Sequence, residues 1–263
     1  MHLGERFGLR WYGLAYLAGF LIAFWLLNLY YRRGRSPMDR EASAEAIMTL
    51  ALGVLIGGRL GYVLLYNLGP SLRDPLSILQ VWKGGMASHG GFAGVLIAGW
   101  IIARKAGMSL ARVSDILATL TPSGLLLGRI ANFINGELWG KISDAPWAVI
   151  FPASAAPGTP IALIPARHPS QLYEAGLEGA VLLIYTQLRF WKSDVIQRPG
   201  VLSGEFLALY GVLRIAGEYF REPDAGLILG MSRGIFYSLF LILAGIGVRI
   251  LAQRKSAPAA SKM

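Results

Sequence analysis

The sequence predicts an all-α polytopic membrane protein with about seven transmembrane helices. The chain has 263 residues, of which 54% are hydrophobic and only 15% are charged, and its mean hydropathy is +0.50. A water-soluble domain of this length needs more charged surface to remain in solution. The apolar residues also come in runs of roughly 17–25, the length of a helix that crosses a hydrocarbon core of about 30 Å. We therefore expect residues 1–263 to form one transmembrane domain.

The spans and their orientation follow from the apolar runs and from the charges between them. The seven expected spans are residues 11–31, 44–67, 87–104, 112–136, 171–191, 200–220 and 234–252. Connections on one side carry fourteen Lys and Arg residues, whereas those on the other side carry eight. Basic residues concentrate in short cytoplasmic loops. The asymmetry predicts a cytoplasmic C-terminus and an N-terminus on the outer side.

The longest connection, residues 137–170, is expected to form a small irregular cap on the outer, periplasmic side. Its six prolines exclude a long helix and favour an irregular chain with short strands; they are Pro146, Pro152, Pro157, Pro160, Pro165 and Pro169. Such a cap can cover a site or guide a polypeptide, or it can merely link two spans. The sequence leaves these alternatives open.

Composition excludes several classes of site. The chain has no cysteine, which excludes disulfides, thiolate metal sites and a cysteine nucleophile. Only three histidines are present, which leaves little scope for a histidine metal cluster, so we expect no metal site. The formal charge of +10 is attributed to topology and to contacts with anionic membrane lipid, not to nucleic acid, because no basic domain is present.

Three arginines, Arg59, Arg129 and Arg214, lie inside the predicted spans. A charge in hydrocarbon is costly, so such residues usually face the protein interior and meet a partner or a polar substrate. With a helical rise of about 1.5 Å per residue, each lies roughly 20–25 Å from the cytoplasmic edge. The sequence therefore predicts a cationic site at one level in the outer half of the membrane.

Each arginine shares one face of its predicted helix with other residues, small or polar, that are spaced three or four positions apart. The three sets are Tyr210, Arg214 and Glu218, with Arg221 beyond them; Arg129, Asn132 and Gly136; and Arg59, Tyr62 and Tyr66. Glu218 is expected to hold Arg214 in place. Nearby small residues allow close approach of helices or of a ligand; they are Gly57, Gly58, Gly61, Gly128, Ala131 and Gly136.

Two histidines are candidates for proton transfer, which imidazole performs near neutrality. His89 stands between glycine pairs at the outer end of residues 87–104; the alternative is a hydrogen-bonded structural histidine. His168 precedes Pro169, with Glu174 and Glu178 following, and reads equally well as a cap residue. Guanidinium groups in a partly dry pocket suit phosphate. The residues therefore predict an outer-leaflet site for an anionic phospholipid with a histidine nearby.

Over residues 11–240 the chain resembles the bacterial prolipoprotein diacylglyceryl transferases. The most specific element is Gly128-Arg-Ile-Ala-Asn-Phe-Ile-Asn-Gly-Glu-Leu-Trp-Gly140. The other motifs, in family order, are Trp11-Tyr12-Gly13, Gly57-Gly58-Arg59-Leu60-Gly61-Tyr62, His89-Gly90-Gly91, His168-Pro-Ser-Gln-Leu-Tyr-Glu174, and Tyr210-Gly-Val-Leu-Arg214 through Arg221-Glu-Pro-Asp224.

The resemblance implies an inner-membrane enzyme with its active site toward the periplasm. It would move diacylglyceryl from phosphatidylglycerol to the lipobox cysteine of a prolipoprotein signal peptide, releasing glycerol phosphate without a cofactor. Arg129 and Arg214 match family arginines regarded as essential, and they are assigned here to the phosphate. His89 matches the histidine often proposed as the base; the alternative is an arginine-polarised group that acts without a base. The other assignments are Tyr12, Asn132 and Glu137 as further catalytic positions; Arg59, Tyr62, Gly140 and His168 for substrate binding; and Tyr210, Glu218 and Arg221 to support and gate the site.

Two other functions are compatible with part of the sequence. An anionic lipid or solute transporter would need a path to the cytoplasmic side, where the halves of the spans are almost purely apolar. An intramembrane serine hydrolase could use Ser123 in Thr121-Pro-Ser-Gly124, but no predicted span places a histidine where it could activate this serine.

Overall fold

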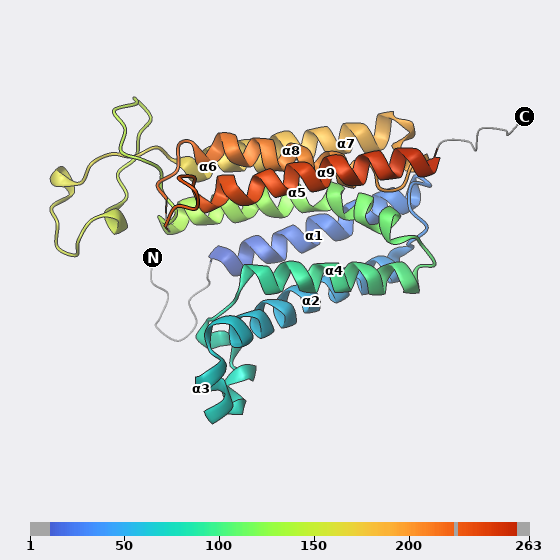
Figure 1. The fold of residues 1–263 in the computed structure, drawn as a ribbon, viewed down its shortest axis with the longest axis horizontal. Coiled ribbons are helices and arrows are strands. Elements are labelled where there is room, and N and C mark those ends of the chain that lie inside the picture. The colour runs from blue at the N-terminus through green and yellow to red at the C-terminus, as the bar shows by residue number, and fades with distance from the viewer. Residues whose placement is uncertain (1–10, 224–225, 257–263) are drawn as a thin grey trace, which may run out of the picture. The chain divides into compact units, whose positions relative to one another are not determined.

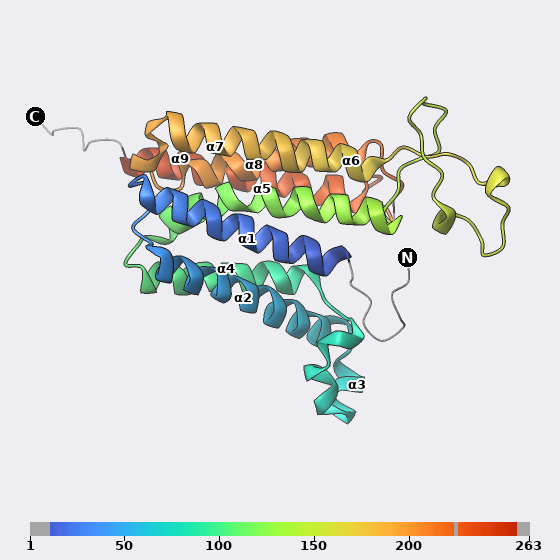
Figure 2. The same ribbon diagram turned by 180° about the vertical axis from the view of Figure 1, so that it is seen from behind.

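The structure, a computed structural model, describes residues 11–223 and 226–256. Within these residues the regular structure is helical and no strand is formed. Each of the seven predicted segments is helical (Figure 1). The long helices are α1 (Trp11–Arg32), α2 (Arg40–Tyr66), α4 (Ser88–Lys105), α5 (Leu110–Asn135), α8 (Val201–Glu218) and α9 (Arg233–Ser256). The remaining segment begins as α6 (Ser170–Glu174), becomes a π-helix over Ala175–Val181 and ends as α7 (Leu182–Lys192), a continuous rod in Figure 2.

Four of these helices, α1, α2, α5 and α9, are long and apolar enough to cross a membrane by themselves. The prediction of an all-α membrane protein is therefore confirmed. Helix α8 falls outside this group because its 18 residues include Glu205, Arg214 and Glu218; intramembrane charges of this kind usually face other helices. The count of seven spans and the orientation of the termini stay predictions. The extreme N-terminus lies outside the described residues.

The chain divides into two compact units. One comprises the chain up to Ile22 and from Asp115 onward, and the other comprises Ala23–Ser114. The prediction of one domain over residues 1–263 stays a prediction.

The Ala23–Ser114 unit is built on the antiparallel pair α2 and α4. Glycines from both helices meet: a Cβ atom added to Gly61 would lie 2.7 Å from the Cα of Gly90, and one added to Gly57 would lie 2.9 Å from the Cα of Gly94. Small residues at such a contact let two backbones approach closely. The predicted role of these glycines in helix approach is thus confirmed. Beyond α2 come α3 (Leu68–Arg73) and two 3-10 turns over Pro75–Leu79 and Val81–Lys83.

The other unit contains the helices from α5 to α9. Helices α8 and α9 pack antiparallel through glycines, since a Cβ atom on Gly204 would lie 2.7 Å from the carbonyl oxygen of Gly245. Asp115, in the second turn of α5, is buried, and its carboxylate accepts hydrogen bonds from the backbone N–H groups of Gly200 (2.8 Å) and Ser203 (2.7 Å). Because helix N-termini leave N–H groups without intrahelical partners, this carboxylate caps α8.

The cap follows α5 and extends beyond the ends of α5 and α6 (Figure 1). The prediction of short strands there is wrong. The described residues form only isolated antiparallel bridges, including Ile142 with Arg167 and Gly140 with Arg221. Proline has no N–H to donate to a ladder. The rest of the cap consists of turns, including 3-10 turns at Pro152–Ser154 and Ile161–Leu163.

Candidate functional site

Two carboxylates buried inside the α5–α9 unit form the centre of an ionic cluster. Glu174 ends α6 and Glu178 lies in the π-helix, and both side chains have 0% exposure. Arg129 of α5 spans the two, with Nη1 3.0 Å from Glu174 Oε2 and Nη2 3.1 Å from Glu178 Oε2. Arg214 of α8 contacts the same two carboxylates, with Nη1 3.2 Å from Glu178 Oε1 and also paired with Glu174 Oε1.

Two further charged residues complete this cluster. Glu218, one turn after Arg214 on α8, places Oε2 2.6 Å from Arg214 Nη2. The prediction that Glu218 holds Arg214 is confirmed. Arg221 is buried beyond the end of α8, with Nη1 3.5 Å from Glu174 Oε1. The ionic cluster therefore comprises Arg129, Arg214, Arg221, Glu174, Glu178 and Glu218.

Local backbone features make room for the carboxylates. The π-helix follows directly after Glu174 and contains Glu178; such segments are rare and occur frequently at functional sites. Gly179 lies against α5, where a Cβ atom would come 2.7 Å from the Cα of Leu126. Gly217 faces Glu174, and a Cβ atom on Gly234 of α9 would lie 2.5 Å from the Glu218 carboxyl carbon. Small residues thus let four segments close around the cluster.

The ionic cluster contains three guanidinium groups and three carboxylates, so its formal charge is balanced. Removing one partner of a buried ion pair leaves an uncompensated charge and typically costs about 3–5 kcal/mol. Sequence reasoning predicted that Arg129 and Arg214 belong to the site, but it mentioned Glu174 and Glu178 only as neighbours of His168. The available signal was their spacing by four within an otherwise apolar segment.

The predicted catalytic residues Tyr12, Asn132 and Glu137 gather near this cluster. Asn132 Nδ2 donates a hydrogen bond to the Tyr12 hydroxyl. Electrostatic interactions join that hydroxyl to Glu137 and Arg129. Buried Gln171, which the sequence analysis did not single out, donates to the backbone carbonyl of Glu137 at 2.7 Å. These contacts connect the end of α5 to the start of α6.

Tyr210 lies one turn before Arg214 on α8. Its hydroxyl is within electrostatic range of Glu178, Arg214 and Arg129, and its ring stacks on Phe206 with centroids 6.0 Å apart. The structure therefore places Tyr210 beside the cluster. Its predicted supporting role remains untested.

His168 and Gly140 belong to the junction between the cap and the helices. His168 Nδ1 lies 3.1 Å from the Tyr173 hydroxyl, which also accepts a hydrogen bond from Trp147 Nε1 at 2.6 Å. The backbone N–H of Gly140 donates to the His168 carbonyl at 3.0 Å. A Cβ atom at Gly140 would lie 2.5 Å from that carbonyl oxygen and 2.7 Å from the Phe220 carbonyl oxygen. The backbone approach explains why glycine stands here; the predicted substrate-binding roles stay predictions.

His89 and Arg59 belong to the Ala23–Ser114 unit. The His89 side chain is exposed in the first turn of α4. Arg59 is buried, and the structure gives it a different environment from Arg129 and Arg214. Its Nε, Nη1 and Nη2 atoms donate to four backbone carbonyls, those of Ile78 (2.9 Å), Gly84 (2.5 Å), Gly85 (3.0 Å) and Ser77 (2.6 Å).

Tyr62 shares the face of Arg59, as predicted. Its ring lies 5.6 Å from the Arg59 guanidinium carbon and stacks on Tyr66 with centroids 6.2 Å apart. Residues Arg59 and Tyr62 also line a cavity of about 230 Å³. Its other lining residues are Asn67, Asp74, Ser77, Gln80, Gly84 and Gly85.

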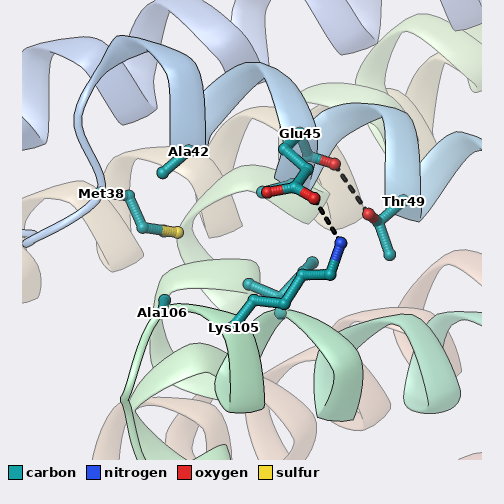
Figure 3. Close-up of a pocket in the computed structure, with 8 residues that line it drawn as sticks. Met38, Ala42, Glu45, Thr49, Lys105 and Ala106 are labelled. Carbon is teal, nitrogen blue, oxygen red and sulfur yellow. Dashed lines mark hydrogen bonds and ion pairs between the residues drawn. The ribbon is translucent and has the colours of Figure 1, made fainter.

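A second, smaller pocket of about 50 Å³ lies between α2 and α4 near their other ends (Figure 3). Lys105 and Glu45 form an ion pair across it, and both side chains are more than half exposed. Exposed ion pairs contribute at most about 1 kcal/mol to the stability of the folded protein. We assign this pocket no role. Among the described residues, no group of His, Cys, Asp and Glu forms a candidate metal site.

Comparison with known proteins adds independent evidence. The family model of prolipoprotein diacylglyceryl transferase matches residues 1–251. A phosphatidylglycerol–prolipoprotein diacylglyceryl transferase of Rhizobium leguminosarum bv. trifolii is 45% identical over 264 residues, covering 95% of this chain and 89% of the relative. The enzymes of the same name from Rhodopseudomonas palustris and Rhodospirillum rubrum are 44% and 46% identical, covering 97% and 94% of this chain and 90% and 89% of the relatives.

Proposed function

Because the chain belongs to the prolipoprotein diacylglyceryl transferase family, we propose that it transfers diacylglyceryl from phosphatidylglycerol to a prolipoprotein. The acceptor is the lipobox cysteine thiol of the signal peptide, and the second product is glycerol phosphate. The observation that carries this proposal is the family match over almost the whole chain. The buried arginines of the ionic cluster support it, because guanidinium groups suit a phosphodiester.

The reaction exchanges one bond for another at a single carbon. The substrate thiol loses its proton, because only the thiolate is a good nucleophile and a free cysteine has a pKa of about 8.5. Its sulfur attacks the glyceryl carbon that carries the phosphate ester, forming a C–S bond. The C–O bond breaks, and its electron pair leaves on the phosphate oxygen as glycerol phosphate. No cysteine of this chain takes part, since it has none.

In this proposal Arg129 and Arg214 bind the phosphate and stabilise the charge that grows on it. Preorganised donors aimed at developing charge are usually the largest single contribution to catalysis. The carboxylates of Glu174 and Glu178 fix both guanidinium groups before the substrate arrives. Tyr12, Asn132 and Glu137 act in the same site, whereas Tyr210, Glu218 and Arg221 support and gate it. His89 is the proposed acceptor of the thiol proton.

The proposed location is the bacterial inner membrane with the site toward the periplasm. Four apolar helices of spanning length support a membrane location. The charge asymmetry between the connections supports the outward direction. Both substrates, a phospholipid and a membrane-inserted signal peptide, reach such a site without leaving the membrane.

The test is a transfer assay in detergent micelles with purified protein, phosphatidylglycerol and a lipobox peptide. We expect glycerol phosphate release that requires the peptide thiol. Arg129→Ala and Arg214→Ala should each lower the rate by about 10²–10³-fold, the cost of losing one donor to developing charge. Arg198→Ala is the matched control, because Arg198 forms its ion pair within the described residues with exposed Asp194, at 2.7 Å. Folded protein that binds phosphatidylglycerol but releases no glycerol phosphate would overturn the proposal.

A further inference from the structure

The cavity beside Arg59 is lined by one buried cation, Arg59, and by one exposed carboxylate, Asp74. Arg59 and Asp74 both line it, yet no ion pair joins them, and the described residues offer Arg59 no carboxylate partner. Asp74 likewise makes no side-chain hydrogen bond or ion pair with the described part of the chain. Opposite charges that share a cavity without meeting are each available to a ligand that carries both an anion and hydroxyl groups.

Arg59 keeps both charge and donor capacity despite its burial. It is 8% exposed, and its four hydrogen bonds go to neutral backbone carbonyls. A guanidinium has five N–H donors, so one donor on Nη2 has no acceptor among the described residues. Carbonyls orient the group but do not cancel its charge. A buried cation of this kind favours an anionic ligand.

The remaining lining residues suit a polyol. Asp74 and Gln80 supply acceptor oxygens, Asn67 supplies an amide whose Nδ2 donates to Ser71 (3.2 Å), and Gly84 and Gly85 form the backbone wall. The cavity of about 230 Å³ exceeds the roughly 30 Å³ share of one water several-fold. A carboxylate accepts two hydrogen bonds from adjacent hydroxyls, which is the arrangement that a vicinal diol offers.

Part of this wall is fixed by tight packing. Gly84 and Gly85 both have positive φ, of 85° and 80°, a conformation that L side chains rarely adopt. A Cβ atom on Gly85 would lie 2.5 Å from the Tyr62 ring. The two glycines thus aim their carbonyls at Arg59 while leaving the cavity open beside Tyr62. The arrangement is built into the backbone before any ligand binds.

We propose that this cavity binds glycerol phosphate outside the transfer step, either as the head group of phosphatidylglycerol before its phosphate is bound by Arg129 and Arg214 or as the released product, with Arg59 on the phosphate and Asp74 on the vicinal diol. This inference rests on the proposed transferase function and adds to it a specificity determinant. It makes Asp74 the residue that distinguishes a glycerol head group from one without hydroxyls. Nothing in the ionic cluster is needed for that discrimination.

The first experiment compares phosphatidylglycerol with phosphatidylpropanol, whose head group lacks the two hydroxyls. We expect the wild-type protein to prefer phosphatidylglycerol at least tenfold in kcat/KM. Asp74→Asn should shrink this preference to below threefold, through a higher KM for phosphatidylglycerol and little change for phosphatidylpropanol. Glu45→Gln is the matched control, an exposed carboxylate of the same unit in the pocket of Figure 3. An unchanged preference in active Asp74→Asn protein would overturn the inference while leaving the transferase function intact.

The second experiment separates the two sources of the ligand and does not depend on turnover. Radiolabelled free glycerol phosphate should bind wild-type protein and bind Asp74→Asn at least fivefold more weakly. Binding of the free compound assigns the cavity to product as well as head group, whereas discrimination between lipids without such binding assigns it to the lipid alone. If wild-type protein shows neither free binding nor any preference between the lipids, the cavity has no such role. A wild-type protein without transfer activity that still binds glycerol phosphate through Asp74 would refute only the proposed function.

Discussion

The equal numbers of positive and negative charges in the ionic cluster should stabilise the folded protein. Testing this requires comparing single substitutions with a double substitution that restores the balance. Arg214→Met leaves three carboxylates facing two guanidinium groups, because Arg214 contacts Glu174, Glu178 and Glu218. The side chains of Glu174 and Glu178 have 0% exposure. Leaving a buried charge without its partner typically costs about 3–5 kcal/mol, so we expect a loss of that size in the free energy of unfolding.

Adding Glu218→Gln to Arg214→Met removes the extra negative charge and should restore part of that stability. Residues of one buried network show coupling energies of roughly 0.5–3 kcal/mol, and three contacts to Arg214 favour the upper part of that range. The assay is equilibrium unfolding of the four proteins of the cycle in mixed detergent and SDS micelles, followed by circular dichroism. Transfer activity should not recover in the double variant, because the guanidinium itself is missing.

The control cycle uses Arg198→Met and Asp194→Asn. This pair is separated by 2.7 Å, but its side chains are about half exposed, at 49% and 55%. Exposed pairs of this spacing couple by about 0.3–0.5 kcal/mol. If the coupling energy in the cluster does not exceed that of the control pair, the buried network stabilises the unit no more than an exposed ion pair does.

Three further predictions concern packing and capping. Gly140→Val should loosen the cap, because its Cβ atom meets the His168 carbonyl oxygen at 2.5 Å; limited proteolysis of the cap should accelerate. Asp115→Asn should lower the free energy of unfolding by about 1–3 kcal/mol, because a buried hydrogen-bonding group loses its partner. Hydrogen exchange at the start of α8 near Gly200 should become faster. Gly57→Leu should separate α2 from α4, where a Cβ atom already lies 2.9 Å from the opposing backbone, and should lower the yield of folded protein.

Each of these substitutions has a counterpart at an open or exposed position. Gly128→Val and Gly91→Leu introduce side chains where no atom lies within 4 Å of the added Cβ atom. Asp194→Asn changes an exposed carboxylate in the same way as Asp115→Asn. Equal proteolysis, exchange or yield in a variant and its counterpart would show that the contact in question contributes nothing.

Sequence reasoning succeeded where the interaction is local. The helical segments followed from apolar runs, and Arg214 with Glu218 followed from a spacing of four on one helix, which the structure gives at 2.6 Å. Both rest on the period of a single helix. The sequence also drew attention to Arg129, because a charge inside an apolar run is costly wherever the helix lies.

The same reasoning failed where the partner is distant along the chain. Glu174 and Glu178 meet Arg129 and Arg214 across 36 to 49 residues, and no periodicity encodes such a contact. The π-helix after Glu174 was not anticipated either. The backbone carbonyls that accept from Arg59 lie 18 to 26 residues further on and were not anticipated; its placement at the level of Arg129 and Arg214 stays a prediction. Every residue has a backbone carbonyl, so residue types alone do not predict which carbonyls accept hydrogen bonds from a given side chain.

A balanced cluster suits the proposed reaction better than an excess of positive charge would. The lipid phosphodiester carries one negative charge, whereas the leaving glycerol phosphate carries up to two near neutrality. An uncompensated cluster would bind the lipid tightly in its ground state and the doubly charged product more tightly still. Binding energy that is already realised with the substrate does not accelerate the chemical step, and a tightly held product leaves slowly. Glutamates that neutralise the arginines reduce this general attraction while keeping each guanidinium oriented. The guanidinium groups then act through directional hydrogen bonds, which strengthen as negative charge develops on the departing oxygen. Because the cluster is neutral overall, it does not retain the glycerol phosphate product.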